Sequence, residues 1–171
     1  MGSSRKGKFV LYLYYMKEKF LYLSFAIVAV LLFLYTFIFV NETHHFVLNA
    51  GWENNLIEAK WLFYLIVGTG ICLWGFYHFF AESLFSEGLI YLHVFSFILL
   101  AIVLVLWDNT SFSLQEAVES QSYNSIEEIK SDYRNIMDDR TGIYRSLFWL
   151  LFLIQPIGLI NLLLGFIRPK S

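Results

Sequence analysis

Four hydrophobic runs without a charged residue dominate this sequence, at 20–40, 61–80, 89–107 and 146–167. Each is close to the roughly 20 residues that an α-helix needs to cross a hydrocarbon core about 30 Å thick. Because backbone groups in lipid must bond to one another, runs of this length should be helices rather than open strands. None has the polar face that a helix of a soluble bundle would show. The sequence therefore predicts an all-α membrane protein, a bundle of four transmembrane helices.

Composition supports this class. Of the 171 residues, 58% are hydrophobic and only 15% are charged, which is more apolar than a soluble domain of this length. The single cysteine, Cys72, can form no intrachain disulfide and belongs to no CxxC motif. No repeat or linker divides the chain, so we expect a single membrane domain over residues 1–171. We expect this domain to contact the lipid bilayer and to bind no nucleic acid.

Lysine and arginine gather at the two ends of the chain. They precede the first run at Arg5, Lys6, Lys8, Lys17 and Lys19, and they follow the last run at Arg168 and Lys170. The loop 41–58 contains neither residue type, and neither does the short loop 81–88. Basic residues near span ends favour the cytoplasmic side. We therefore expect a protein of the cell membrane or inner membrane with both termini in the cytoplasm. The basic residues at the chain ends are the evidence for this orientation.

The polar segment 108–142 lies between the third and fourth runs, and this topology places it outside. Ser113 with Glu116, and Ser125 with Glu128, fit the capping box that begins a helix, which predicts two short helices here. In the second, apolar residues recur at helical spacing: Ile126, Ile129, Tyr133, Ile136 and Met137. A stripe in so short a segment needs another surface, which is the bilayer, the other outer loop or a partner.

The fourth run carries amides and glycines on one helical face, at Gln155, Gly158, Asn161 and Gly165. Amides are costly in hydrocarbon, while small residues let helix backbones approach closely. This face either packs against another helix of the chain or lines a pore or site. Pro156 beside it frees a backbone carbonyl and predicts a kink.

The second run has a related face, made by Gly68, Cys72 and Gly75 and continued by Glu82. Small residues at this spacing are typical of transmembrane helix interfaces. We expect a close helix contact here.

Two histidines, His78 and His93, should lie at similar depth on adjacent antiparallel helices. Such a pair could hold a b-type haem between two imidazoles, or it could handle protons or ions together with Glu82 and Glu87. The alternative is hydrogen bonding at the membrane interface. We expect no cofactor and keep haem b as a remoter alternative.

The loop 41–58 also contains ligand types for a metal, His44 and His45 with Glu42 and Glu53, but not at a recognised spacing. We expect a solvated loop and no metal site. No catalytic Ser-His-Asp set or H-E-x-x-H motif can be assembled, and none of the four runs contains a carboxylate.

These patterns favour a non-catalytic membrane subunit. It would form a homo-oligomer or join a membrane complex, and it would sense or transmit a signal through its outer segment. One alternative is an oligomeric pore or channel lined by the polar face of the fourth run. A remoter one is a redox subunit that uses His78 and His93.

Overall fold

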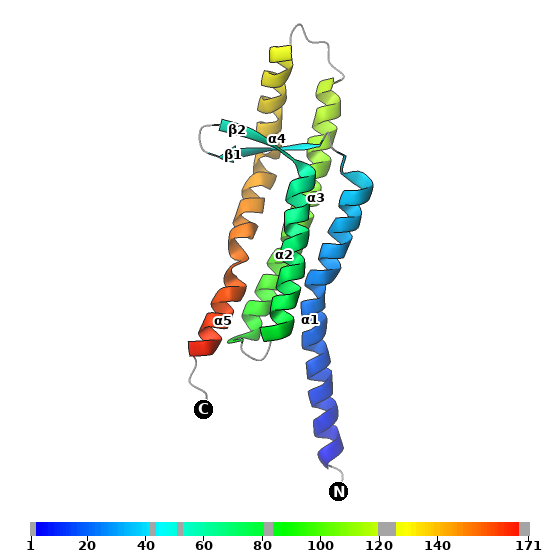
Figure 1. Cartoon of the computed structure of the whole chain (residues 1–171), viewed down its shortest axis with the longest axis vertical. Coiled ribbons are helices and arrows are strands. Elements are labelled where there is room, and N and C mark those ends of the chain that lie inside the picture. Colours follow the sequence, from blue (N-terminus) through cyan, green and yellow to red (C-terminus); the bar gives the residue numbers. More distant parts are fainter. Residues whose placement is uncertain (1–2, 42–43, 51–52, 81–83, 120–125, 168–171) are drawn as a thin grey trace.

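The chain folds into an elongated helical bundle with a small β-hairpin (Figure 1). The structure, a computed structural model, describes residues 3–41, 44–50, 53–80, 84–119 and 126–167, with side chains at 21–41, 44–46, 57–80, 84–114 and 140–167. In chain order the elements are α1 (Ser3–Phe39), β1 (His45–Ala50), β2 (Glu53–Glu58), α2 (Ala59–Phe80), α3 (Glu87–Glu119), α4 (Ile126–Ile154) and α5 (Ile157–Ile167). The beginning of α1 and the end of α5 lie at the same end of the bundle (Figure 1).

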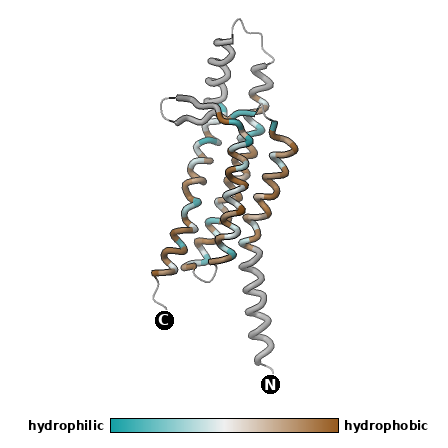
Figure 2. Tube along the Cα trace, viewed as in Figure 1, coloured by the Kyte–Doolittle hydropathy of each residue, from teal (hydrophilic) through white to brown (hydrophobic). Residues whose placement is uncertain are grey.

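The structure contains four stretches that are helical, long and apolar enough to cross a membrane: Leu21–Phe39, Ala59–Phe80, Glu87–Leu114 and Arg140–Ile167. Hydrophobic residues cover them between the hairpin and the opposite end of the bundle (Figure 2). Many point outward, and Phe37, Phe79 and Ile167 are 80%, 81% and 77% exposed. In water such a surface would be a liability, whereas lipid accepts it. The prediction of an all-α bundle with four long apolar helices is confirmed, and the chain is a multi-pass membrane protein.

The helices on either side of the outer segment are longer than predicted. The sequence suggested two short separate helices over 108–142, but the described residues of this range belong to the ends of α3 and α4. Ser113 does not begin a helix, since it lies within α3 and its hydroxyl donates to the carbonyl of Asn109 at 2.9 Å. The other predicted start, at Ser125, lies outside the described residues, and α4 is described from Ile126 onward.

The loop 41–58, predicted to be solvated, contains an antiparallel hairpin. His45 pairs with Glu58 at the base, and Ala50 pairs with Glu53 at the tip. The hairpin is tied to the membrane helices at its base, where the backbone N–H of Ala59 donates to the carbonyl of His44 at 2.9 Å. Next to this bond, the ring of Phe46 is fully buried and packs 4.5 Å from that of Trp107 in α3.

The predicted kink at Pro156 is a break that separates α4 from α5. Gln155 and Pro156 form a turn, in which the N–H of Gln155 bonds to Phe152 at 3.1 Å instead of four residues back. Proline has no N–H for its own helical bond, and this accounts for the break.

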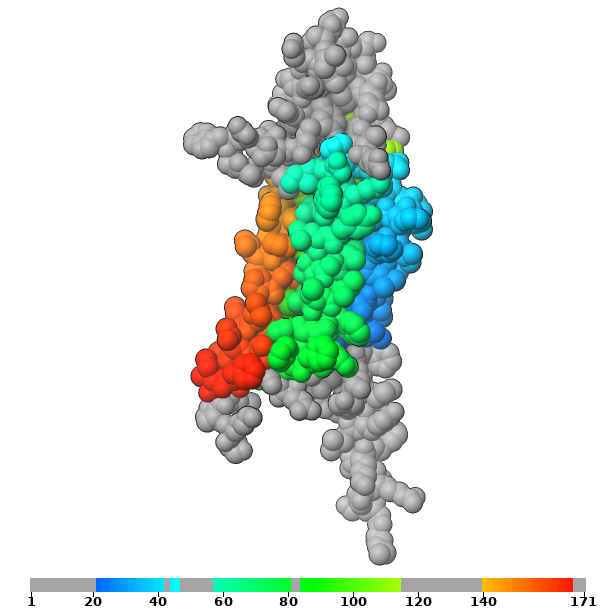
Figure 3. Space-filling model, in the orientation of Figure 1, coloured from blue at the N-terminus to red at the C-terminus, as the bar shows by residue number. Residues whose placement is uncertain are grey.

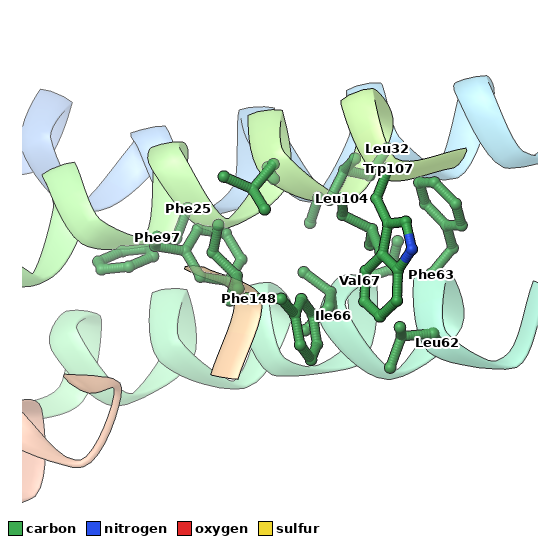
Figure 4. Close-up of a cluster of buried hydrophobic side chains, with 14 of the residues drawn as sticks. Phe25, Leu32, Leu62, Phe63, Ile66, Val67, Phe97, Leu104, Trp107 and Phe148 are labelled. Atoms are coloured by element: carbon green, nitrogen blue, oxygen red, sulfur yellow. The ribbon is translucent and has the colours of Figure 1, made fainter. Parts of the chain in front are cut away.

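The core of the bundle is an apolar cluster to which α1, α2, α3 and α4 contribute (Figure 4). Its largest side chains include Phe25, Phe63, Phe97, Trp107 and Phe148, none more than 1% exposed. Half of the most hydrophobic stretch of α3 is buried, against 22–33% in the other three spans. The third span is therefore the central helix, and the others pack around it.

Among the glycines of α2, Gly70 and not the predicted face contacts the neighbouring helices. A Cβ on Gly70 would lie 2.8 Å from Phe97 Cζ and 3.2 Å from the backbone carbonyl of Phe25. A Cβ on Gly68 or Gly75 would meet no atom within 4 Å, and Cys72 is exposed. The contact predicted for these three residues is thus not made within the described chain, and their face points outward.

We predict that Gly70→Leu destabilises the protein by about 2 kcal/mol, because the larger side chain overpacks the contact between α2 and the helices α1 and α3. The midpoint of thermal unfolding in detergent should fall by about 5 °C. Gly68→Leu, on the same helix but in open space within the chain, is the matched control and should leave the midpoint of the monomeric fraction unchanged or raise it. Equal effects of the two substitutions would contradict the packing described here.

Candidate functional site

His93 is the centre of a buried polar cluster inside the membrane region, which we call the inner cluster: Tyr77, His93, Ser96 and Gln155. The Tyr77 hydroxyl lies 2.7 Å from His93 Nδ1, and His93 Nε2 lies 3.0 Å from Gln155 Oε1. Ser96 lies one turn along α3, and its hydroxyl accepts a long bond of 3.5 Å from Gln155 Nε2. Residues of α2, α3 and the α4–α5 turn are therefore joined in the protein interior.

The side chain of Gln155 also supplies a donor to a backbone carbonyl at the helix break. Its Nε2 donates to the carbonyl of Leu151 at 2.9 Å, the acceptor that the N–H of Gln155 would use in a regular helix. This contact orients the amide, so that Oε1 accepts from His93 Nε2–H, and His93 Nδ1 accepts from the hydroxyl of Tyr77. Every polar atom of the imidazole and the amide thus has a partner. Such a cluster stabilises one helix arrangement.

Gly158 lets the α5 backbone approach this cluster. A Cβ at this position would lie 2.9 Å from both His93 Cε1 and His93 Nδ1, and 3.1 Å from the Tyr77 hydroxyl. Glycine is therefore required by the close approach, which agrees with the predicted role of a small residue on this face.

Asn161 extends the inward face of the fourth span. Its side chain is fully buried, accepts from the N–H of Ser86 at 2.9 Å and donates to the carbonyl of Ser86 at 3.0 Å. Its own carbonyl accepts from the N–H of Phe85 at 3.2 Å. Asn161 thus holds the residues before α3 against α5, while Gly165 at the end of the face is partly exposed. The polar face of the fourth span packs within the chain.

The two histidines of the predicted pair are not brought together. His78 is exposed on α2 and stacks on Trp74 with ring centroids 6.0 Å apart, whereas His93 is buried with both ring nitrogens bonded. Glu87 is the exposed first residue of α3, and Glu82 lies outside the described residues. This arrangement does not supply the facing imidazoles that a haem or a proton-handling pair would use.

A second polar cluster lies at the other end of the bundle, where the hairpin meets α1 and α3. We call it the outer cluster: Tyr35, His44, Asp108 and Asn109. His44 Nδ1 lies 3.2 Å from Asp108 Oδ1, and the Tyr35 hydroxyl lies 2.9 Å from Asp108 Oδ2 and 3.2 Å from Asn109 Oδ1. His44 is only 6% exposed, so the expectation of a solvated loop is wrong at this residue.

Three buried atoms in and beside the outer cluster have no partner among the described residues: His44 Nε2 in the cluster, and Trp107 Nε1 and Ser111 Oγ next to it on α3. Trp107 and Ser111 lie one turn apart on α3, and the His44 ring packs 4.5 Å from the ring of Phe112. An unsatisfied buried polar group costs about 1–3 kcal/mol. The outer cluster is therefore less completely bonded than the inner one, whose imidazole and amide are fully paired.

Sequence reasoning missed Tyr35, Tyr77, Ser86, Ser96 and Asp108. A buried partner for His93 could have been sought among the hydroxyls of neighbouring spans, because intramembrane imidazoles need one. Asp108 directly follows the third hydrophobic run, and a carboxylate at this position could have indicated a polar cluster at the end of the span.

In the part of the chain whose side chains are described, no group of three or more His, Cys, Asp or Glu residues could hold a metal ion. Comparison with protein families, with curated proteins and with solved structures finds no match to this chain. The functional argument therefore rests on the geometry of the two clusters and of the helices that join them.

Proposed function

We propose that this protein is a non-catalytic membrane subunit that joins a second copy or another membrane protein and transmits a state between its outer segment and the membrane. In this proposal both termini are cytoplasmic and the segment 108–142 is outside, with the basic residues near both chain ends as support. The beginning of α1 and the end of α5 at one end of the bundle agree with an even number of crossings (Figure 1).

The continuity of α3 and α4 carries the proposal. The helix α3 has 33 residues, about 50 Å at 1.5 Å per residue, and α4 has 29, about 44 Å. A hydrocarbon core takes about 30 Å of such a length. The helix α3 therefore extends well past the core without a break, while α4 runs unbroken from the outer segment to the break at Pro156, inside the fourth span. A displacement of the outer part of either helix moves its membrane part as well.

The difference between the two clusters supports a direction for this movement, from the outer segment toward the inner cluster. The inner cluster is fully bonded around His93 and Gln155, and it couples the α4–α5 turn to α2 and α3, so that a displacement of α4 reaches both helices. The outer cluster joins the hairpin to α1 and α3, but His44 Nε2 in it and Ser111 Oγ beside it have no partner among the described residues. Incomplete bonding reduces the preference for one arrangement, so the outer end is the part most easily altered by a partner.

The outward face of α2 supports association with a partner. Gly68 and Gly75 have free space around them in this chain, and small residues at a lipid-facing position let another helix backbone approach. A pore lined by the fourth span has less support, because Gln155 and Asn161 are at most 8% exposed and bonded within the chain.

The proposal predicts that binding to the outer segment moves the inner ends of the helices. In a Cys72→Ala background, spin labels at Phe79→Cys and Phe166→Cys, both exposed positions, report the distance from α2 to α5. An antibody fragment against residues 108–142 should change this distance by about 2 Å, the size of known helix shifts.

Ile143→Gly places two consecutive glycines in α4 at an exposed position and should reduce the change, because α4 then transmits less displacement and α3 alone stays continuous. Ile143→Ala keeps the helix rigid and should retain it. An unchanged distance in the parent protein, with the fragment bound, would contradict transmission through α3 and α4.

We further predict that the complex extracted from native membranes in mild detergent is heavier than the single chain of 20.1 kDa. Gly68→Leu combined with Gly75→Leu should reduce its mass toward that of the chain, because the larger side chains block helix approach. Val30→Leu, at a lipid-facing position of α1, is the control and should not. A strictly monomeric protein with no copurifying partner would count against the subunit role.

A further inference from the structure

The helix α1 is much longer than the span that it contains. It has 37 residues, of which the last 19, Leu21–Phe39, form the apolar span. This span packs against α2, and the two helices are in contact on the face shown in Figure 3. The preceding residues 3–20, which we call the α1 extension, add about 27 Å of helix. The extension runs past the ends of the other helices, and no other described helix or strand lies beside it (Figure 1).

The centre of the α1 extension is apolar. Residues 9–16 are eight consecutive hydrophobic residues, and four of them are aromatic: Phe9, Tyr12, Tyr14 and Tyr15. Eight residues make more than two turns, so hydrophobic residues occur at every angle around the helix axis there. Water does not favour such a stretch, whereas aromatic residues are enriched where a membrane meets water.

Basic residues lie on both sides of this apolar stretch. Three precede it and two follow it, namely Arg5, Lys6, Lys8, Lys17 and Lys19. Glu18 is the one acidic residue of the α1 extension. A cluster of about four to eight basic residues beside a transmembrane helix is typical of segments that bind anionic lipids. The charge therefore favours a partner that is negative at its surface and apolar just below it, as an anionic bilayer is.

The length of the α1 extension determines where residues 9–16 can lie. Met16 precedes Leu21 by five residues, about 7 Å along the helix. The headgroup layer is about 5–7 Å thick on each side of the hydrocarbon core. A helix along the membrane normal would therefore place residues 9–16 in water. A helix along the headgroups keeps them from water and holds the basic residues near the phosphates.

We propose that the α1 extension binds the surface of a bilayer leaflet rich in anionic phospholipids. Its positive charge is attracted to the phosphates, and residues 9–16 lie among the headgroups and the first carbons of the acyl chains. The proposal does not rest on the subunit role, since it involves neither the outer segment nor α3 and α4.

The test measures the depth of a nitroxide label at Leu13→Cys in a Cys72→Ala background. The full chain is placed in nanodiscs of phosphatidylcholine, either alone or with about one third phosphatidylserine. Dissolved oxygen detects a label in lipid, and a water-soluble nickel chelate detects a label in water. The ratio of lipid-bound to water-exposed label should be at least about tenfold higher with phosphatidylserine. Salt at about 1 M should remove this difference, because it screens the charges.

Charge variants separate electrostatic attraction from apolar burial. Lys6→Gln combined with Lys8→Gln should lower the ratio in the anionic nanodiscs by about fivefold for each lysine, the effect of about 1 kcal/mol. Lys6→Arg combined with Lys8→Arg keeps the charge and is the matched control, which should keep the ratio. Both positions lie in the part of α1 beyond the bundle, so the midpoint of thermal unfolding should not change (Figure 1).

An equal ratio in the two kinds of nanodisc would overturn the proposal, and so would an equal effect of the glutamine and arginine variants. A label that leaves water only when two chains share a nanodisc would assign the α1 extension to a second copy. That result would overturn the proposal as well.

Discussion

A polar side chain in the hydrocarbon core has no water to bond, and this constraint determines how the fourth span is placed. Gln155 and Asn161 each have an amide at membrane depth, and both are bonded to atoms of the chain itself, Gln155 to His93 and Leu151 and Asn161 to Ser86. These bonds require the face to turn inward, toward α3. The close approach of Gly158 to His93 and Tyr77 agrees with this orientation.

The two ends of the bundle differ in how completely their buried polar atoms are hydrogen-bonded. Near the inner end, a tyrosine, a histidine and a glutamine from three parts of the chain pair completely, and the helices are held in one arrangement. Near the outer end, Asp108 bonds to Tyr35 and His44, but atoms of His44, Trp107 and Ser111 have no partner among the described residues. The helix α3, and α4 as far as the break at Pro156, connect the two ends, and the proposed transmission depends on this difference.

The sequence predicted what depends on local pattern: the four spans, the inward polar face and the break at Pro156. It did not predict the outer cluster, because His44 and Asp108 are 64 residues apart and only the fold brings them together. Small residues at Gly68 and Gly75 indicated close approach but not its partner, and the contact within the chain is at Gly70. The capping box at Ser113 suggested the start of a separate helix, yet neither glycine nor proline occurs between Asp108 and Glu119 to stop α3.

A double-mutant cycle on His93 and Gln155 tests the central claim most directly, that polar residues of the fourth span hold the bundle from inside. The free energy of unfolding in detergent is measured for His93→Leu, Gln155→Leu and both together. Each single substitution leaves a buried partner unpaired, so the double variant should be more stable than the sum predicts by about 1 kcal/mol or more. The exposed His78→Leu, combined with Gln155→Leu, should be additive. Additivity of the His93 and Gln155 pair as well would contradict the account.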